Sequence, residues 1–317
     1  MSWVRSALII GMTLFPSTAL LVAIPGEGLA QQRAKGVRVQ GHAARNSGKR
    51  LALVIGNAGY KSAPLRNPVN DARAMTVTLR GLGFEVIALE NANQSHMKRA
   101  IDEFGKKLRQ QGGVGLFYYS GHGMQVKGRN YMIPVGAKVA GEADVEYEAV
   151  DAGRVLAKMD TAGNGMNIVI LDACRNNPFA RSFRAANNGL ATMDAPSGTL
   201  IAYATAPGKV AADGDGRNGL YTEQLIRYMK QPGLTLESVF KKVRSIVRRK
   251  SGGRQIPWEA SSLEGEFFFA RAKGDPSSPI AKTQPRSASQ PPKTIDAEET
   301  LWKTIEKSTD IDEFQDY

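Results

Sequence analysis

A chain of 317 residues with 42% hydrophobic residues can bury a sizeable core and carry appendages outside one large domain. Its single cysteine excludes a framework of internal disulfides. The formal net charge is +12 at pH 7, yet Lys and Arg are spread along the chain. Their densest cluster, between Lys241 and Lys250, has the helical spacing of a solvated helix face. We therefore expect no nucleic-acid partner.

Residues 1–30 have the features of a secretory signal peptide. Arg5 precedes a mostly apolar run at 7–24, and Gly28-Leu29-Ala30 follows the small-x-small rule for cleavage before Gln31. Pro16-Ser17-Thr18 interrupts the run, which makes it a poor membrane-spanning helix. We expect an exported protein, periplasmic or secreted, that contacts a membrane only if this segment stays uncleaved as an anchor.

After a polar leader at 31–48, patterns of buried strands alternate with patterns of amphipathic helices. Strands are expected at 51–55, 84–89, 114–119, 166–171, 199–204 and 266–269. Helices are expected at 70–82, 97–108, 150–159, 220–229 and 236–249, and a hairpin at 124–134 turns at 127–130. This alternation predicts an α/β three-layer sandwich, in which helices cover both faces of a mainly parallel six-stranded sheet.

The composition also predicts where the domain ends. The alternating pattern occupies 49–271, and a long polar stretch at 175–197 interrupts it, which is usual for a functional or disordered loop. Residues 272–295 are rich in Pro, Ser, Lys and Gln and are predicted to form a disordered linker. A short helical tail is predicted at 296–317, because Leu301, Trp302 and Ile305 have helical spacing.

Two motifs place reactive side chains just after predicted strands. Tyr118–Gly123 reads YYSGHG and Leu171–Arg175 reads LDACR, so His122 and Cys174 each follow an apolar strand. In an open α/β sheet, ligands bind beyond the carboxyl ends of the strands, where a thiol and an imidazole can act as nucleophile and base. By themselves, a buried structural cysteine and a solvated loop histidine are also consistent with these positions.

These motifs and their surroundings, from about Lys49 to Phe269, resemble the caspase-like cysteine peptidases of clan CD and their bacterial metacaspase-like members. The resemblance also includes the segments at 51–57, 65–72, 203–208 and 218–222. It implies a caspase-like fold and a cysteine-type endopeptidase. It further implies that Cys174 is the nucleophile, that His122 is the acid–base group, and that the Gly123 and Cys174 amides form the oxyanion hole.

The resemblance also implies a specificity. In metacaspases the positions that match Asp71, Ser120 and Asp172 line a pocket for Arg or Lys before the scissile bond, because carboxylates complement a cation. The expected partners are therefore peptides or proteins with Arg or Lys at that position. A helix cap at Asp71 and a strand-end turn at Asp172 are the structural alternatives. Pro68 stands where many metacaspases have a second cysteine, which is not their main nucleophile.

The long loop after Cys174 carries Arg181 and Arg184, which suit such a pocket and are candidate autocleavage sites. No metal site is expected, because the Asp-rich turn at 213–218 has Arg217 at a ligand position and Gln224 where an EF-hand needs glutamate. No cofactor is expected either, although the sequence does not establish whether calcium is needed. The rival function is a catalytically silent caspase-like module for binding or signalling.

Overall fold

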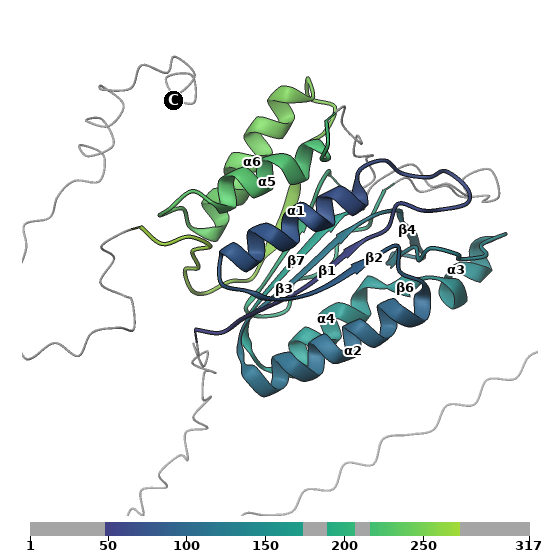
Figure 1. Ribbon diagram of the computed structural model, residues 1–317, viewed down its shortest axis with the longest axis horizontal. Helices are drawn as coiled ribbons and strands as arrows, with labels where there is room; N and C mark the ends of the chain where they lie inside the picture. Colours follow the sequence, from purple (N-terminus) through teal and green to yellow (C-terminus); the bar gives the residue numbers. More distant parts are fainter. Residues whose placement is uncertain (1–47, 174–188, 207–215, 273–317) are drawn as a thin grey trace, which may run out of the picture. The chain divides into compact units, whose positions relative to one another are not determined.

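The computed structural model describes residues 48–173, 189–206 and 216–272 (Figure 1). The predicted signal peptide, linker and tail lie outside the described residues, apart from the single linker residue Ala272, and so does the leader except for Gly48. Within those three ranges, no helix is both long enough and apolar enough to cross a membrane.

A six-stranded sheet forms the centre of the described residues. Its strands, in spatial order, are β2 Glu85–Glu90, β1 Arg50–Gly56, β3 Gly113–Ser120, β7 Gly165–Asp172, β8 Thr199–Tyr203 and β9 Trp258–Ser261. All neighbours pair in parallel except β8 and β9, which are antiparallel. The expected mainly parallel six-stranded sheet is therefore present.

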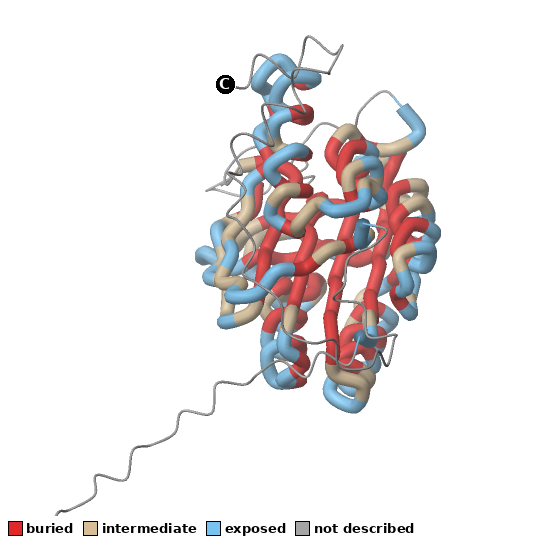
Figure 2. Tube along the Cα trace, turned by 90° about the vertical axis from the view of Figure 1, so that its left-hand side faces the viewer, coloured by how far each residue is buried: buried red, intermediate tan, exposed pale blue. Residues whose placement is uncertain are grey.

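Helices cover the sheet on both sides, as the alternating pattern predicts. One layer contains α1 Pro68–Gly81, α5 Leu220–Met229 and α6 Leu236–Lys250, and the other contains α2 Gln94–Gln111 and α4 Ala152–Ala162 (Figure 1). Parallel strands that are covered on both faces read as continuous apolar runs. All eight residues of β3 are accordingly buried, and the strands form the buried centre of Figure 2.

A small second sheet joins this sandwich close to the end of β3. It consists of β4 Gly123–Val126, β5 Arg129–Met132 and β6 Val150–Asp151, with α3 Glu142–Glu148 between β5 and β6. Lys127 and Gly128 have φ of 51° and 76°, the left-handed values that a two-residue hairpin turn requires. The predicted hairpin is confirmed, whereas α3 and β6 were not expected, and α4 begins at Ala152 rather than at residue 150.

The prediction of a final strand at 266–269 is wrong. The sixth strand is β9, and in 266–269 the backbone makes only an isolated bridge between Phe268 and Thr235. The apolar pattern has another cause, because the Phe267 and Phe269 side chains are buried beside the start of β1. There the Arg50 guanidinium donates hydrogen bonds to the Phe268 and Phe269 carbonyls at 3.0 and 2.8 Å and lies 4.9 Å from the Phe267 ring.

Candidate active site

The predicted site residues follow strands that lie side by side in the sheet. Chain order reverses between β1 and β3, because β2 lies on one side of β1 and β3 on the other. Such a switch point is where parallel α/β sheets open a crevice for ligands. Gly56, Ser120 and Asp172 form one row of the register at the carboxyl ends of β1, β3 and β7. His122 follows β3 by two residues.

The proposed nucleophile is not part of the described structure. Cys174, Arg181 and Arg184 lie outside the described residues, and the last described residue before them is Ala173, which is buried. Gly123 packs against this residue. A Cβ on Gly123 would lie 2.7 Å from the Ala173 carbonyl oxygen and 2.9 Å from the Ala173 Cβ. Only glycine allows this approach, which holds the histidine loop against the chain that leads into Cys174.

Contacts on both the ring and the backbone hold His122 in place. Only 2% of the residue is exposed, and its ring centroid lies 4.5 Å from that of Tyr60. Nε2 lies 2.7 Å from the carbonyl oxygen of Ala63. Because a carbonyl only accepts, Nε2 carries the proton, and in the neutral imidazole Nδ1 is the basic atom. The Tyr119 hydroxyl also donates to the His122 carbonyl at 2.7 Å.

Two buried carboxylates lie at the same end of the sheet. Asp71 is 0% exposed in the first turn of α1, and Asp172 is 2% exposed at the end of β7. The Ser120 hydroxyl donates to Asp71 Oδ2 at 3.4 Å, which makes it a long hydrogen bond. A Cβ on Gly56 would lie 2.4 Å from the Pro68 carbonyl, so this glycine lets α1 begin directly over the end of β1. The structure thus brings Asp71, Ser120 and Asp172 together.

The start of α5 binds Asp71. The Asn218 side-chain amide and the Gly219 backbone N–H each donate to Asp71 Oδ1 at 2.9 Å. The structural alternative for Asp71 was a helix cap. Its carboxylate does accept hydrogen bonds at the start of a helix, but that helix is α5 and not α1, to which Asp71 belongs. In α1 the capping position is Asn67, whose side chain makes no capping hydrogen bond.

The same turn of α5 also reaches Asp172. The Thr222 hydroxyl donates to Asp172 Oδ2 at 2.8 Å and lies 2.6 Å from the Tyr118 hydroxyl. The Thr222 hydroxyl has one proton and donates it to the Asp172 carboxylate. In the bond between Tyr118 and Thr222, the Tyr118 hydroxyl is therefore the donor. Burial raises the pKa of Tyr118 well above its ordinary value, and the nearby charges of Asp71 and Asp172 raise it further. The phenol therefore stays protonated and remains a donor.

Sequence reasoning assigned no role to Asn218 or Thr222. The only sequence feature that pointed to these residues was the family resemblance of the segment 218–222. Asn and Thr form hydrogen bonds with many partners, so a linear pattern does not show which partner they bind. Tyr60 and Ala63 gave no signal at all. Their roles depend on a loop between β1 and α1 that folds over the end of β3, where the Tyr60 hydroxyl accepts from the His122 backbone N–H at 3.0 Å.

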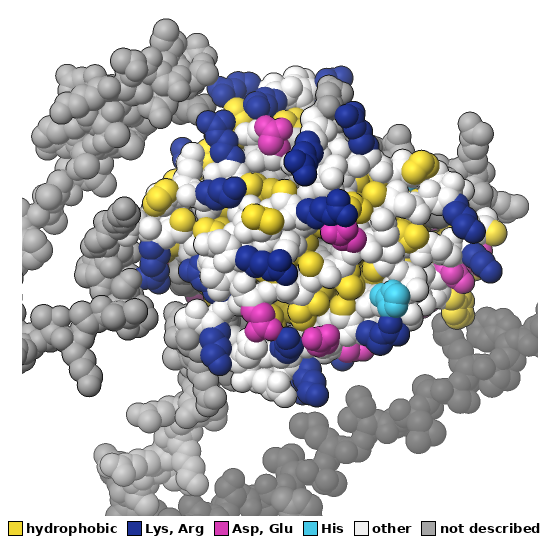
Figure 3. Space-filling model, viewed as in Figure 1, with side chains coloured by type: hydrophobic (Ala, Val, Ile, Leu, Met, Phe, Trp, Pro, Cys, Tyr) yellow, Lys and Arg dark blue, Asp and Glu magenta, His cyan; other side chains and the backbone are white. Residues whose placement is uncertain are grey.

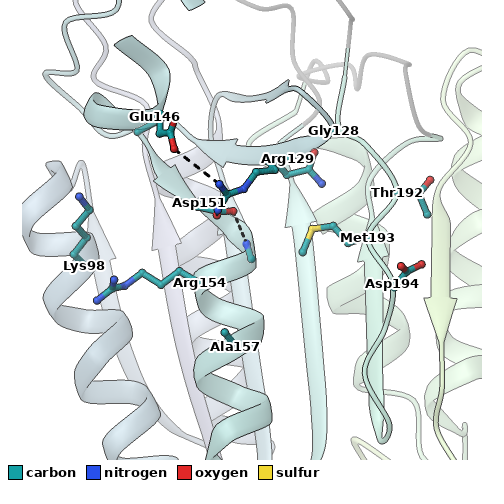
Figure 4. Close-up of a pocket in the computed structure, with 13 residues that line it drawn as sticks. Lys98, Gly128, Arg129, Glu146, Asp151, Arg154, Ala157, Thr192, Met193 and Asp194 are labelled. Carbon is teal, nitrogen blue, oxygen red and sulfur yellow. Dashed lines mark hydrogen bonds and ion pairs between the residues drawn. The ribbon is translucent and has the colours of Figure 1, made fainter. Parts of the chain in front are cut away.

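A separate cavity of about 670 Å³ lies beside the β4–β5 hairpin and α4, and it contains none of the predicted site residues (Figure 4). Arg129 forms ion pairs there with Asp151 and with Glu146, so charges in its lining neutralise one another. Across the ranges that the structure describes, no group of three or more His, Cys, Asp or Glu residues could hold a metal ion. Part of the turn at 213–218 lies outside those ranges.

Comparisons with known proteins give the family. A family model described as the caspase domain matches residues 49–268. The mucosa-associated lymphoid tissue lymphoma translocation protein 1 of Homo sapiens and its homolog in Mus musculus are each 35% identical over 127 residues. These matches cover 40% of this chain but only 15% of each relative, so the chain spans a small part of their length.

Among solved structures, the Drosophila initiator caspase Dronc is similar with a TM-score of 0.47 and 17% sequence identity. The similarity covers 69% of this chain and 81% of that chain. The caspase-domain match includes β1 through β9 and extends over more than half of the sequence. The chain therefore belongs to the caspase-like peptidases of clan CD.

Proposed function

We propose that the protein is a cysteine endopeptidase that cleaves after Arg or Lys, with Cys174 as nucleophile and His122 as general base and acid. One observation carries the proposal: buried His122 and the buried carboxylates Asp71 and Asp172 converge at neighbouring strand ends. Cys174 follows Asp172 by two residues in the sequence. Membership of the caspase-like family supplies the reaction class.

In the proposed mechanism, Nδ1 of His122 accepts the thiol proton, while the Ala63 carbonyl keeps the other ring nitrogen protonated. The thiolate of Cys174 forms a bond with the peptide carbonyl carbon, and backbone N–H groups of Gly123 and Cys174 stabilise the oxyanion. The imidazolium then protonates the leaving amine as the C–N bond breaks. Water, deprotonated by the same imidazole, hydrolyses the thioester and restores the thiol.

The proposed specificity follows from charge. Two carboxylates in a buried setting favour the guanidinium or ammonium of the substrate residue before the scissile bond. An Asp side chain in the same position would bring like charges together, which costs several kcal/mol in a desolvated site. Ser120 pairs with Asp172 in the register and donates to Asp71, and its hydroxyl oxygen can accept a hydrogen bond from the bound Arg or Lys side chain.

The test uses the purified full chain and fluorogenic peptides that differ only in Arg, Lys or Asp before the reporter, with and without calcium. Cys174→Ala and His122→Ala should each abolish cleavage, and the double variant should be little worse, because the two residues act as one unit. His96→Ala, which changes an exposed histidine of α2, is the matched control and should keep full activity.

Turnover retained by Cys174→Ala would contradict the assignment of the nucleophile. A folded wild-type chain that cleaves none of the peptides and does not react with a thiol-reactive Arg peptide would favour the silent binding module instead. Preference for Asp peptides would contradict only the pocket. The three outcomes separate the reaction class from the specificity.

We further propose that the protein acts after export, in the periplasm or outside the cell. Arg5, the apolar run at 7–24 and the Gly28-Leu29-Ala30 site support this proposal. Intact-mass measurement should find a mature chain that begins at Gln31. Soluble cytoplasmic protein that retains Met1 would contradict it.

A further inference from the structure

The helix pair α5–α6 carries a concentration of positive charge. Residues 216–261 contain ten Lys and Arg against three Glu. On the face seen in Figure 3, Lys and Arg side chains gather over these two helices. Four exposed cations of α6, Lys241, Lys242, Arg248 and Arg249, follow one side of the helix and are called here the α6 basic stripe. Within the described ranges, Lys241, Lys242 and Arg248 form no ion pair.

Arg244 lies between the two pairs of stripe residues in the sequence, but it pairs with Glu259 of β9 and is not counted in the stripe. Three of the four stripe residues keep an uncompensated charge within the described ranges. Cations gathered on one side of a helix are what an acidic segment would complement.

The same chain contains such a segment. Residues 296–317 hold eight Asp and Glu against two Lys, so their formal charge is opposite to that of the rest of the chain. A segment of this composition complements the stripe in charge.

The chain leaves the described structure next to this surface. The Gly233 N–H, in the turn between α5 and α6, donates to the Ala270 carbonyl at 3.0 Å, and the last described residue is Ala272. The 23 residues at 273–295 would span roughly 26 Å as a random coil. Since the 15 residues of α6 extend for about 22 Å, the segment at 296–317 can reach the whole stripe.

We propose that the acidic segment at 296–317 docks on the α6 basic stripe of its own chain. Tethering keeps the segment at an effective concentration on the order of millimolar, so individually weak surface pairs are enough to populate the contact. Docking also offsets the mutual repulsion of the like charges that make up the stripe.

The test is zero-length carbodiimide crosslinking of the full chain, followed by mass spectrometry of the linked peptides. Crosslinks should join Lys241 or Lys242 to carboxylates of 296–317, and their yield should fall at high salt because the contact is exposed. R248E/R249E keeps both reporter lysines and should lower the yield roughly tenfold. The matched control R99E/R109E reverses two exposed arginines of α2 and should leave the yield unchanged.

A variant that restores the opposite charges gives a second measurement. Adding D312R/E313R to R248E/R249E re-creates opposite charges and should recover the crosslinks, even if R248E/R249E alone lowers stability. Crosslinks that form equally with Lys106 of α2, or that survive R248E/R249E, would overturn the proposal. So would mixed-mass links in an equal mixture of ¹⁴N and ¹⁵N protein, because the segment would then bind a second copy. The proposal would also be overturned if no crosslinks to 296–317 formed and the protein instead bound a polynucleotide or anionic vesicles, with R248E/R249E abolishing that binding.

Discussion

Different donors hold the two buried carboxylates. An amide and a backbone N–H from the start of α5 bind Asp71, and the hydroxyl of Thr222 binds Asp172. These donors are neutral, so they satisfy hydrogen-bonding capacity without adding positive charge. In the proposed specificity pocket, a bound Arg or Lys side chain would add a cation to these neutral donors.

Asp71→Asn tests the charge without removing the shape. The asparagine Oδ1 can still accept from Gly219, so the start of α5 should keep its position. The kcat/KM for Arg peptides should fall by roughly 100-fold to 1000-fold, because a desolvated charge pair contributes about 3–4 kcal/mol. Asp160→Asn, at an exposed position of α4, is the matched control. Unchanged kcat/KM in Asp71→Asn would assign Asp71 to the structural role alone.

At the scale of elements, α5 joins three others through one buried turn. Asn218 and Gly219 connect it to α1, and Thr222 connects it to β3 through Tyr118 and to β7 through Asp172. Both carboxylates therefore depend on the placement of a single helix. Any displacement of α5 would move the two sides of the proposed pocket together.

Thr222→Val should loosen this connection. Valine keeps the shape but leaves the Tyr118 hydroxyl and Asp172 without that bond, which should cost about 1–3 kcal/mol of unfolding free energy. KM for Arg peptides should rise more than kcat falls, because Asp172 loses its orientation. Thr222→Ser keeps the hydroxyl and should restore most of both values. Equal behaviour of the Ser and Val variants in denaturant melts and kinetics would exclude the hydrogen bond as the cause.

Ion pairs between elements predict how acid acts on the fold. Lys107 lowers the pKa of Glu85, Arg73 lowers that of Glu90, and Lys158 together with Arg154 lowers that of Asp102, in each case chiefly through a hydrogen bond. A carboxylate whose folded pKa lies below its unfolded value stabilises the fold above the unfolded pKa and loses this effect as pH falls through the folded pKa.

Stability should therefore decline as pH falls below the ordinary values of 4.5 for Glu and 3.8 for Asp. The effect should be small, because all seven side chains are partly exposed. In urea melts across this range, E85Q/E90Q/D102N should show a shallower decline than wild type. An equally steep decline in the variant would locate the acid sensitivity in other carboxylates.

For the whole molecule, the two ends of the loop after Cys174 are attached independently. β7 and β8 pair with each other in the sheet, on either side of that loop. Beyond the loop, Asn130 exchanges two hydrogen bonds of 2.7 Å with the backbone of Ala191, and the Met193 N–H donates to the Tyr203 hydroxyl at 3.0 Å. A cut within 175–188 would leave both sides held in the same fold.

We expect autocleavage after Arg181 or Arg184 in active protein and none in Cys174→Ala. Because both sides stay attached, the fragments should elute as one species under native conditions and separate only in denaturant. Mass spectrometry of the purified enzyme identifies the cut. An intact segment at 175–197 with full activity would contradict processing, and a cut after Asp would contradict the proposed pocket.

The order of parallel strands and helices could be read from the sequence because strands covered on both faces need continuous apolar runs, and these runs stand out in a linear pattern. The same logic placed His122 and Asp172 at strand ends and Asp71 in a first helical turn. The edge strand β9 escaped prediction, since it is short, polar on average and ordered by its pairing with β8.

The linear pattern was enough to predict which residues follow the central strands, because local periodicity depends only on neighbours in the chain. The contacts of those residues depend instead on how the folded elements pack. Asn218 binds Asp71 across 147 positions, Thr222 binds Asp172 across 50, and the Ala63 carbonyl sets the protonated nitrogen of His122 across 59. A hydrogen bond between residues far apart in the chain leaves no periodic trace, because it depends on how the elements pack and not on the order of residue types.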